Sequence, residues 1–304
     1  MVELEATADH LLEGAEQSAI ENLLKDASLS HDLKTMLLYR ACFHGENGEF
    51  LNKVGEIPVP HQPVGAGARL LIVPGMNFDN HPETGASGEL VETIGQRLGF
   101  DVTMLKIKSL GSATENATLL ERQLPTQREK PAWVVTLSKG TADFRGALNR
   151  LGGWPDWLSG WINLSGVFQG TPVANRLTDS RDMRTLALRA LIAVGGLVAR
   201  GIAEMRTDSV LWANAVTPPH PDRLLHVIGY PPTWTIEMRI SHHYKWLAAN
   251  HGPSDGVIPL KECLEYPGRI YPVWGADHFM RGPELARLVY KLLHYVALQG
   301  RLGQ

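Results

Sequence analysis

One stretch of the chain, Trp133-Val134-Val135-Thr136-Leu137-Ser138-Lys139-Gly140, predicts most of its architecture. The β-branched and aromatic residues at its start are typical of a buried strand, and this strand ends at Ser138. Gly140 and a helix-like segment that runs through Leu148 follow at once. A strand, a sharp turn and a helix in this order lift the Ser138 hydroxyl above the end of a parallel sheet, where a serine is placed to act as a nucleophile.

Candidate partners for Ser138 stand further along the chain. Asp255 lies in Ser254-Asp255-Gly256-Val257-Ile258-Pro259, and His278 lies in Trp274-Gly275-Ala276-Asp277-His278-Phe279. A serine hydroxyl is a weak nucleophile that needs a base to take its proton, and the base needs an acid to orient it. We expect His278 to be the base and Asp255 the acid.

Other roles stay open for these positions. Asp222 and Asp277 are rivals for the acid, although adjacent residues such as Asp277 and His278 seldom direct their side chains toward one another. His278 has an alternative role as a cap of the last helix. The chain order of serine, aspartate and histidine favours the interpretation as nucleophile, acid and base.

Segments of strand and helix character alternate around Ser138. The expected strands, in chain order, are Arg69–Val73, Val102–Leu105, Trp133–Leu137, Trp161–Leu164, Leu225–Tyr230 and Arg269–Trp274. The first of them is apolar from Leu70 to Val73, as expected for a strand that is covered on both faces. Helical stripes lie between the strands, and the last helix starts near Pro283. The alternation predicts an α/β fold in which a mostly parallel sheet has helices on both faces.

The chain divides into two parts by sequence pattern. Residues 1–66 form an N-terminal helical extension and linker, with apolar residues at helical spacing in Leu11–Leu24 and Leu33–Ala41. Pro58, Pro60 and Pro63 then mark a linker. Residues 67–304 form the α/β domain.

Composition limits the classes of function. Hydrophobic residues make up 44% and charged residues 20%, which is the ordinary range for a globular protein. The net charge of −3 offers no basic excess for nucleic acid. The two cysteines, Cys42 and Cys263, are too few for a disulfide framework and favour a reducing cytoplasm. The N-terminus lacks the layout of a secretory signal, and the apolar run Ala190–Ala199 is far shorter than the roughly 20 residues that span a bilayer.

Three motifs together resemble the α/β-hydrolase superfamily, in particular its lipase- and esterase-like branch. Val73-Pro74-Gly75-Met76-Asn77-Phe78-Asp79-Asn80 is similar to the oxyanion loop of bacterial lipases, with Pro74 in place of the usual histidine. The run that starts at Asp255 matches the Asp-Gly-x-Val-Pro pattern that commonly holds the catalytic acid. The segment from Ile162 to Gly166 and on to Pro172 resembles the lipase loop after the next strand. The resemblance covers Arg69 to the C-terminus.

The stretch around Ser138 departs from the Gly-x-Ser-x-Gly pattern of this superfamily at one position. Thr136 occupies the place of the first glycine, where a small residue is usual because the backbone passes close to the following helix. We expect a slightly altered turn that still presents Ser138.

The resemblance implies a helical cap at about residues 173–215, because the superfamily inserts caps after the strand that follows the nucleophile. The segment is rich in leucine, isoleucine and valine, and we expect Leu191 and Leu197 to face the substrate. A helix packed on the sheet is the alternative.

The resemblance also implies a function, that of a serine hydrolase cleaving a carboxylic ester or thioester with an apolar acyl part. Ser138 would form an acyl-enzyme, and the backbone N–H groups of Met76 and Lys139 would bind the oxyanion. Asn77 and Val167 are further candidates for substrate contact. An acyltransferase that uses the same acyl-enzyme is an alternative, and so is a non-catalytic binding protein of this fold.

The expected partner is a small-molecule substrate. Neither a metal nor a cofactor is expected, nor are nucleic acid or stable membrane insertion, and the sequence leaves the oligomeric state open. His242 and His243 suggest a metal site, but no second ligand pair stands at a suitable spacing. The Lys139 side chain has two possible roles: it steers an anionic substrate, or it is a solvated lysine at a helix start.

Overall fold

A computed structural model of the chain describes residues 1–14, 17–58, 63–65, 68–81, 84–124, 131–179, 197–281 and 283–302. At its centre lies a sheet of six strands in the order β2-β1-β3-β4-β5-β6, and every neighbouring pair in it is parallel. The strands are β1 (Arg69–Val73), β2 (Asp101–Met104), β3 (Ala132–Leu137), β4 (Leu158–Leu164), β5 (Leu224–Tyr230) and β6 (Arg269–Trp274). The predicted α/β fold class is therefore confirmed, and each expected strand is present.

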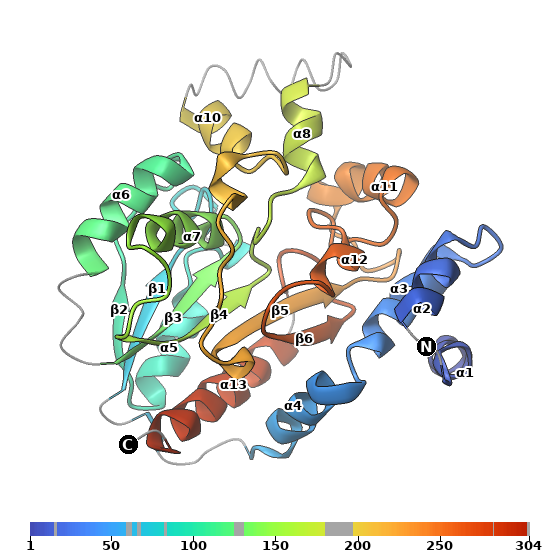
Figure 1. The fold of residues 1–304 in the computed structure, drawn as a ribbon, viewed down its shortest axis with the longest axis horizontal. Helices are drawn as coiled ribbons and strands as arrows, with labels where there is room; N and C mark the ends of the chain where they lie inside the picture. The colour runs from blue at the N-terminus through green and yellow to red at the C-terminus, as the bar shows by residue number, and fades with distance from the viewer. Residues whose placement is uncertain are drawn as a thin grey trace.

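Helices cover both faces of the sheet (Figure 1). The helices α5 (Glu89–Arg97) and α13 (Pro283–Leu302) pack together on one face, and α6 (Ala113–Gln123) and α7 (Gly140–Arg150) pack together on the other. Apolar strands such as β1, in which Leu70 to Val73 are fully buried, form the core between these layers. Because all strands are parallel, the loops after β1, β3, β4, β5 and β6 meet at one edge of the sheet.

Four helices precede the sheet among the residues that the structure describes, where the sequence predicts two. They are α1 (Val2–Leu12), α2 (Gln17–Lys25), α3 (His31–Ala41) and α4 (Gly45–Glu56). The helix α4 begins with glycines and an asparagine, which hide its helical pattern in the sequence. Its Phe50 and Val54 join the main core, whereas Ala8, Leu12, Met36 and Leu37 form a small cluster of their own. The extension thus packs on the sheet through α3 and α4.

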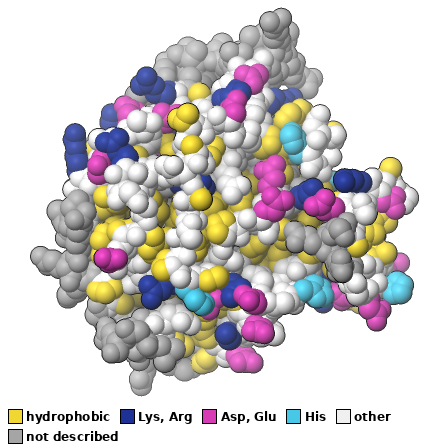
Figure 2. All heavy atoms as spheres, viewed as in Figure 1, with side chains coloured by type: hydrophobic (Ala, Val, Ile, Leu, Met, Phe, Trp, Pro, Cys, Tyr) yellow, Lys and Arg dark blue, Asp and Glu magenta, His cyan; other side chains and the backbone are white. Residues whose placement is uncertain are grey.

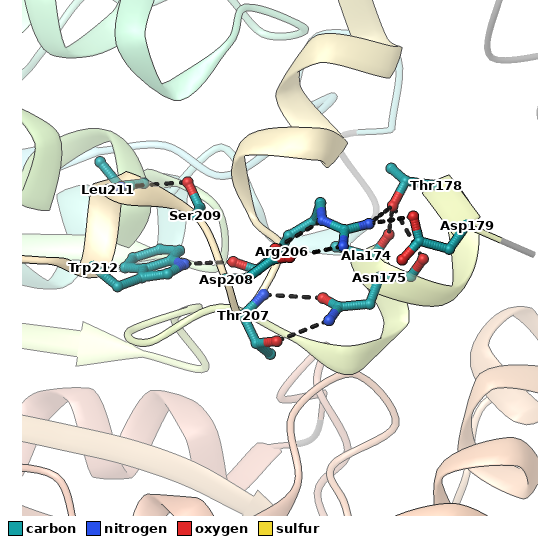
Figure 3. A network of polar contacts seen from close by, with 10 residues as sticks. All are labelled: Ala174, Asn175, Thr178, Asp179, Arg206, Thr207, Asp208, Ser209, Leu211 and Trp212. Carbon is teal, nitrogen blue, oxygen red and sulfur yellow. Dashed lines mark hydrogen bonds and ion pairs between the residues drawn. The ribbon is translucent and has the colours of Figure 1, made fainter.

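The predicted cap region begins with α8 (Pro172–Asp179) and resumes with α10 (Leu197–Glu204), and the two helices contact each other. Figure 3 shows how the chain just after α10 is tied to α8. Arg206 donates to Thr178 Oγ1 at 2.5 Å and pairs with Asp179 at 2.6 Å. Asn175 exchanges two hydrogen bonds with Thr207, at 2.8 and 2.9 Å. The predicted cap residue Leu191 lies outside the described residues.

The remaining elements are short. They are α11 (Ser241–Asn250), α12 (Leu260–Cys263) and the 3₁₀ turns Val210–Trp212, Pro221–Arg223 and Met238–Ile240. Among the described helices, none combines the length and apolar character needed to cross a bilayer. On the face shown in Figure 2, acidic and basic side chains are interspersed with hydrophobic ones, so neither sign of charge dominates that face.

Candidate active site

Ser138 sits at a sharp turn between β3 and α7, as the sequence predicts. Its φ angle of 46° lies in the left-handed region, which strains a residue other than glycine. The turn is held by the Ser138 N–H, which donates to the Leu164 carbonyl at 3.0 Å, and by the Val167 N–H, which donates to the Ser138 carbonyl at 3.2 Å. Gly140 must be glycine, because a Cβ there would collide with the backbone carbonyls of Val73 and Pro74.

Three side chains from three loops meet at this turn. Ser138 Oγ lies 2.9 Å from His278 Nε2, and His278 Nδ1 lies 2.8 Å from Asp255 Oδ2. Ser138 follows β3, Asp255 follows α11, and His278 follows β6. The Asp255 side chain is fully buried and the His278 side chain nearly so. A hydroxyl, an imidazole and a carboxylate in this arrangement can pass a proton from the serine to the histidine while the aspartate holds the ring.

Asp255 is held in place by its own loop. Its Oδ1 accepts the backbone N–H groups of Val257 at 2.8 Å and Ile258 at 2.6 Å, which leaves Oδ2 for the histidine. The His278 N–H also donates to the Asp255 carbonyl at 2.8 Å, so backbone and side chain both join the two loops.

Neither rival aspartate contacts the His278 ring. The Asp277 carboxylate accepts the N–H groups of Glu237 and Phe279, and burial raises its pKa. Asp222 pairs with Arg269 at 2.6 Å, before β5 and at the opposite edge of the sheet.

Two backbone N–H groups beside Ser138 are free to bind a ligand. Within the described part of the chain, the N–H groups of Met76 and Lys139 have no hydrogen-bond partner. Gly75 lets the loop after β1 run close to the turn, since a Cβ there would lie 3.2 Å from the Leu137 carbonyl oxygen and 3.5 Å from Ser138 Cβ. Both donors therefore remain unpaired in loops beside Ser138, and their role as an oxyanion hole stays a prediction.

The Lys139 side chain takes neither of the roles that the sequence suggests. It is 2% exposed and its Nζ pairs with Asp143 at 2.5 Å, one turn further along α7. Asp143 also accepts a hydrogen bond from Asn116 at 2.8 Å. Burial raises the pKa of Asp143 to about 6, although Lys139 and Asn116 act in the opposite direction. The prediction of a solvated or substrate-steering lysine is wrong, because the turn directs this side chain back into the protein.

A chain of hydrogen bonds behind the turn explains the departure at Thr136. Trp161 Nε1 donates to Thr136 Oγ1 at 2.8 Å, and Thr136 Oγ1 lies 2.7 Å from Thr141 Oγ1. Thr141 donates to Asn163 Oδ1 at 2.7 Å, and Asn163 Nδ2 lies 2.9 Å from His226 Nδ1. We call Trp161, Thr136, Thr141, Asn163 and His226 the buried network. Each of its side chains is at most 1% exposed.

The groups at the two ends of the buried network determine which group donates in each of its hydrogen bonds. The indole of Trp161 can only donate, and the Asn163 carbonyl oxygen can only accept, so Thr136 donates to Thr141. At the far end His226 Nε2 lies 2.9 Å from the Pro267 carbonyl oxygen, to which it donates while its Nδ1 accepts. This is the neutral form of the imidazole, and burial lowers the pKa of His226 to about 4. A glycine at position 136 would leave the Trp161 N–H without its acceptor.

A cavity of about 320 Å³ opens beside Ser138 and His278. Its walls are mainly apolar, with Leu90 and Val91 of α5 on one side and Leu285 and Val289 of α13 on another. The loop after β1 adds further lining residues, including the predicted contacts Met76 and Asn77.

The lining of the cavity bears on the predicted substrate contacts Leu191, Leu197 and Val167. The described residues of the cap region, 173–179 and 200–215, contribute no lining residue, and the side chain of Leu197 lies outside the description. The contacts expected of Leu191 and Leu197 therefore stay predictions, and the apolar wall formed by described residues comes from α5 and α13. Val167 does not line the cavity either, because its side chain is buried in the core and its N–H holds the turn at Ser138.

Among the described residues, no group of three or more histidine, cysteine or acidic side chains gathers as a metal site requires. His242 Nε2 instead lies 3.1 Å from Arg176 Nη2. His243 is mostly buried, and this burial lowers its pKa to about 4.

Comparison with known proteins gives a result at the level of the fold. No protein-family model matches the sequence, and no curated protein does. The structure is similar to that of the lipase BlEst2 of Bacillus licheniformis in its mature form, with a TM-score of 0.52, 14% sequence identity and coverage of 81% of this chain and 94% of that one. The propeptide form of the same lipase matches with a TM-score of 0.54 and 16% identity over 77% of this chain and 52% of that one.

The chain has the α/β-hydrolase fold. In this fold the loops after the parallel strands build the site, which is where Ser138, Asp255 and His278 meet.

The sequence patterns do not indicate a role for Ser165, although it lies at the candidate site. Ser165 follows β4 and lines the same cavity as Ser138. It was not singled out because a serine before a glycine at a strand end is ordinary in a turn. The register of β3 and β4 is the signal that could have found it.

Proposed function

We propose that this protein is a serine hydrolase that cleaves carboxylic esters or thioesters with an apolar acyl part. The observation that carries the proposal is the hydrogen-bonded path from Ser138 through His278 to Asp255, at the wall of a mainly apolar cavity. Similarity to a protein named as a lipase supports the choice of ester chemistry.

In the first half of the reaction Ser138 Oγ attacks the carbonyl carbon of the substrate. His278 Nε2 accepts the hydroxyl proton as the new C–O bond forms, and Asp255 stabilises the imidazolium. The N–H groups of Met76 and Lys139 bind the oxyanion of the tetrahedral intermediate. The intermediate then collapses, His278 returns the proton to the leaving alcohol or thiol, and an acyl-enzyme remains on Ser138.

In the second half a water molecule takes the place of the alcohol. His278 accepts a proton from this water as its oxygen attacks the acyl carbon. Collapse of the second intermediate releases the carboxylic acid and restores the Ser138 hydroxyl. The apolar acyl part would lie between α5 and α13, where Leu90, Val91, Leu285 and Val289 remove it from water.

We propose that the enzyme is located in the cytoplasm. Cys42 and Cys263 are both free and buried, which fits a reducing compartment.

The test is hydrolysis of p-nitrophenyl esters of increasing acyl length by the wild type and by Ser138→Ala. We expect kcat/KM to fall by on the order of 10⁴- to 10⁶-fold in the variant, because the nucleophile is lost. Ser87→Ala is the matched control: Ser87 neighbours the cavity without lining it, and its variant should keep wild-type activity. Equal activity of Ser138→Ala and the wild type, or no hydrolysis by the wild type of any ester or thioester offered, contradicts the proposal.

A further inference from the structure

Ser165 follows β4 in the same way that Ser138 follows the adjacent strand β3. Leu137 of β3 pairs with Leu164 of β4, so Ser138 and Ser165 are each the first residue past a paired position. The Ser138 N–H donates to the Leu164 carbonyl, which joins the two turns directly. Both serines line the cavity of the proposed active site.

The backbone of Ser165 is strained in the same way as that of Ser138. In the part of the chain that the structure describes, four residues other than glycine have positive φ: Asn77 at 60°, Ser138 at 46°, Ser165 at 45° and Met280 at 50°. All four line this cavity. Such strain costs on the order of 1–3 kcal/mol for each residue and gathers at functional sites. The strained backbone of Ser165 is therefore a feature of the candidate active site, as is that of Ser138.

The hydroxyl of Ser165 lacks the partner that its burial calls for. The residue is 3% exposed, and its Oγ has no hydrogen bond within the described part of the chain, whereas Ser138 Oγ is bonded to His278. Of the buried side-chain polar atoms left without a partner among the described residues, Ser165 Oγ is the one that belongs to a residue lining this cavity. Native structures rarely leave a buried hydroxyl unpaired.

The order of the strands tells which part of a substrate Ser165 faces. Met76 follows β1 on one side of β3, and Ser165 follows β4 on the other side. The carbonyl oxygen of a substrate is directed toward the N–H of Met76, away from Ser165. His278 follows β6, on the same side as β4, and it must reach the leaving oxygen to protonate it. The order of the strands thus places Ser165 on the side of Ser138 where the leaving alcohol is expected.

We propose that Ser165 Oγ forms a hydrogen bond with the alcohol part of the substrate and so selects esters whose alcohol carries a second oxygen near the scissile bond. The proposal rests on the hydrolase function proposed above. A site that offers a hydrogen-bond partner to a substrate oxygen disfavours the analogue that lacks this oxygen, because the partner is then left unpaired in the complex.

The experiment compares two substrates of equal size, 2-hydroxyethyl butyrate and propyl butyrate. The wild type should favour the hydroxyethyl ester, and Ser165→Ala should reduce the ratio of the two kcat/KM values by roughly tenfold. Ser165→Gly removes the same hydroxyl and accepts the positive φ without strain. Both variants should lose the preference equally even if their stabilities differ, and Ser87→Ala should keep the wild-type ratio.

The outcomes separate this inference from the function on which it rests. If Ser138-dependent hydrolysis of both esters persists but the ratio is unchanged in Ser165→Ala and Ser165→Gly, the role of Ser165 is wrong and the hydrolase function stands. Equal loss of activity on both esters also overturns selection by the hydroxyl. If the wild type cleaves neither ester and no other ester or thioester, the failure lies with the proposed function itself.

Discussion

Two regions of the molecule are held by polar side chains, and they differ mainly in their exposure to water. The buried network lies behind the Ser138 turn, with the Lys139–Asp143 pair beside it. The cap-base network, formed by Asn175, Thr178, Asp179, Arg206, Thr207 and Asp208, lies at the surface (Figure 3). Hydrogen-bond lengths in the two are similar. Burial, and not bond length, should therefore decide which of them the fold depends on.

The fold should depend more on the buried network because a polar group that loses its partner costs more free energy when it is buried. A buried donor or charge that loses its partner keeps the full penalty of its removal from water, whereas an exposed one is solvated again. The buried network holds the strand and helix that flank Ser138, so its loss should reach the site. The cap-base network joins α8 to the chain after α10, and its loss should stay local.

The largest effect is expected for Lys139→Met, which leaves the Asp143 carboxylate buried without its cation. The free energy of unfolding should fall by about 3–5 kcal/mol at pH 8. The loss should be smaller at pH 5, because the carboxyl group, whose pKa burial already raises to about 6, can then take up a proton. Urea denaturation at both pH values measures this. Lys108→Met, which breaks the exposed pair with Glu115, is the control and should cost less than about 1 kcal/mol. Equal losses in the two variants would remove the distinction between buried and exposed pairs.

A pH-dependent effect of about 3 kcal/mol is expected from His226. The ordinary pKa of histidine is about 6.5, and burial lowers the pKa of His226 to about 4 in the folded protein. As the pH falls below 6.5, the unfolded chain binds a proton that the folded protein does not, so stability is lost until the pH reaches about 4. The shift of the pKa corresponds to about 3 kcal/mol over this range.

Urea denaturation between pH 4 and pH 7 checks this by comparing the wild type with His226→Gln. The variant lacks the titrating group, so its stability should depend less steeply on pH over that range. Identical slopes for the two proteins would mean that His226 does not carry the effect.

A smaller effect is expected for Thr136→Val, which keeps the shape of the side chain and removes its hydroxyl. The Trp161 N–H then has no acceptor, and the free energy of unfolding should fall by about 1–3 kcal/mol. Thr118→Val removes an exposed hydroxyl that bonds only to its own helix, and it should change stability by less than about 0.5 kcal/mol. If Thr136→Val is as stable as the wild type, the buried network does not explain why threonine replaces glycine here.

The smallest effect is expected for Arg206→Gln in the cap-base network. This variant removes two ion pairs, with Asp179 and Asp208, from an exposed surface. The loss of unfolding free energy should be smaller than that of Thr136→Val and should vanish in 1 M salt, because water and ions screen such pairs. A loss as large as that of Lys139→Met would show that exposure does not rank the two regions.

The sequence predicts those features of the fold and of the candidate site that depend on local patterns. Strands such as Arg69–Val73 were predicted at their observed bounds, because an apolar run between turns has few other interpretations. Ser138, Asp255 and His278 were found because each lies in a local motif, and the structure places them within hydrogen-bond distance. The roles assigned to them remain predictions.

Contacts between residues that are far apart in the sequence could not be predicted from local patterns. The cavity wall comes from α5 and α13, which are far apart in the sequence, and no local pattern indicates that they face Ser138. The ion pair of Lys139 depends on the direction in which a strained turn points its side chain. The buried network joins residues of β3, α7, β4 and β5, whose side chains meet only in the folded sheet.

The central claim, that Ser138 is the nucleophile, is tested most directly by the position of a covalent label. A fluorophosphonate probe should modify one serine, and trypsin, which cuts after Lys139, should place the label on the peptide that ends there and not on the peptide that holds Ser165. The account predicts a label on Ser138, slower labelling of His278→Ala, and no labelling of a folded Ser138→Ala variant. A label on another serine, or undiminished labelling of Ser138→Ala, would contradict it.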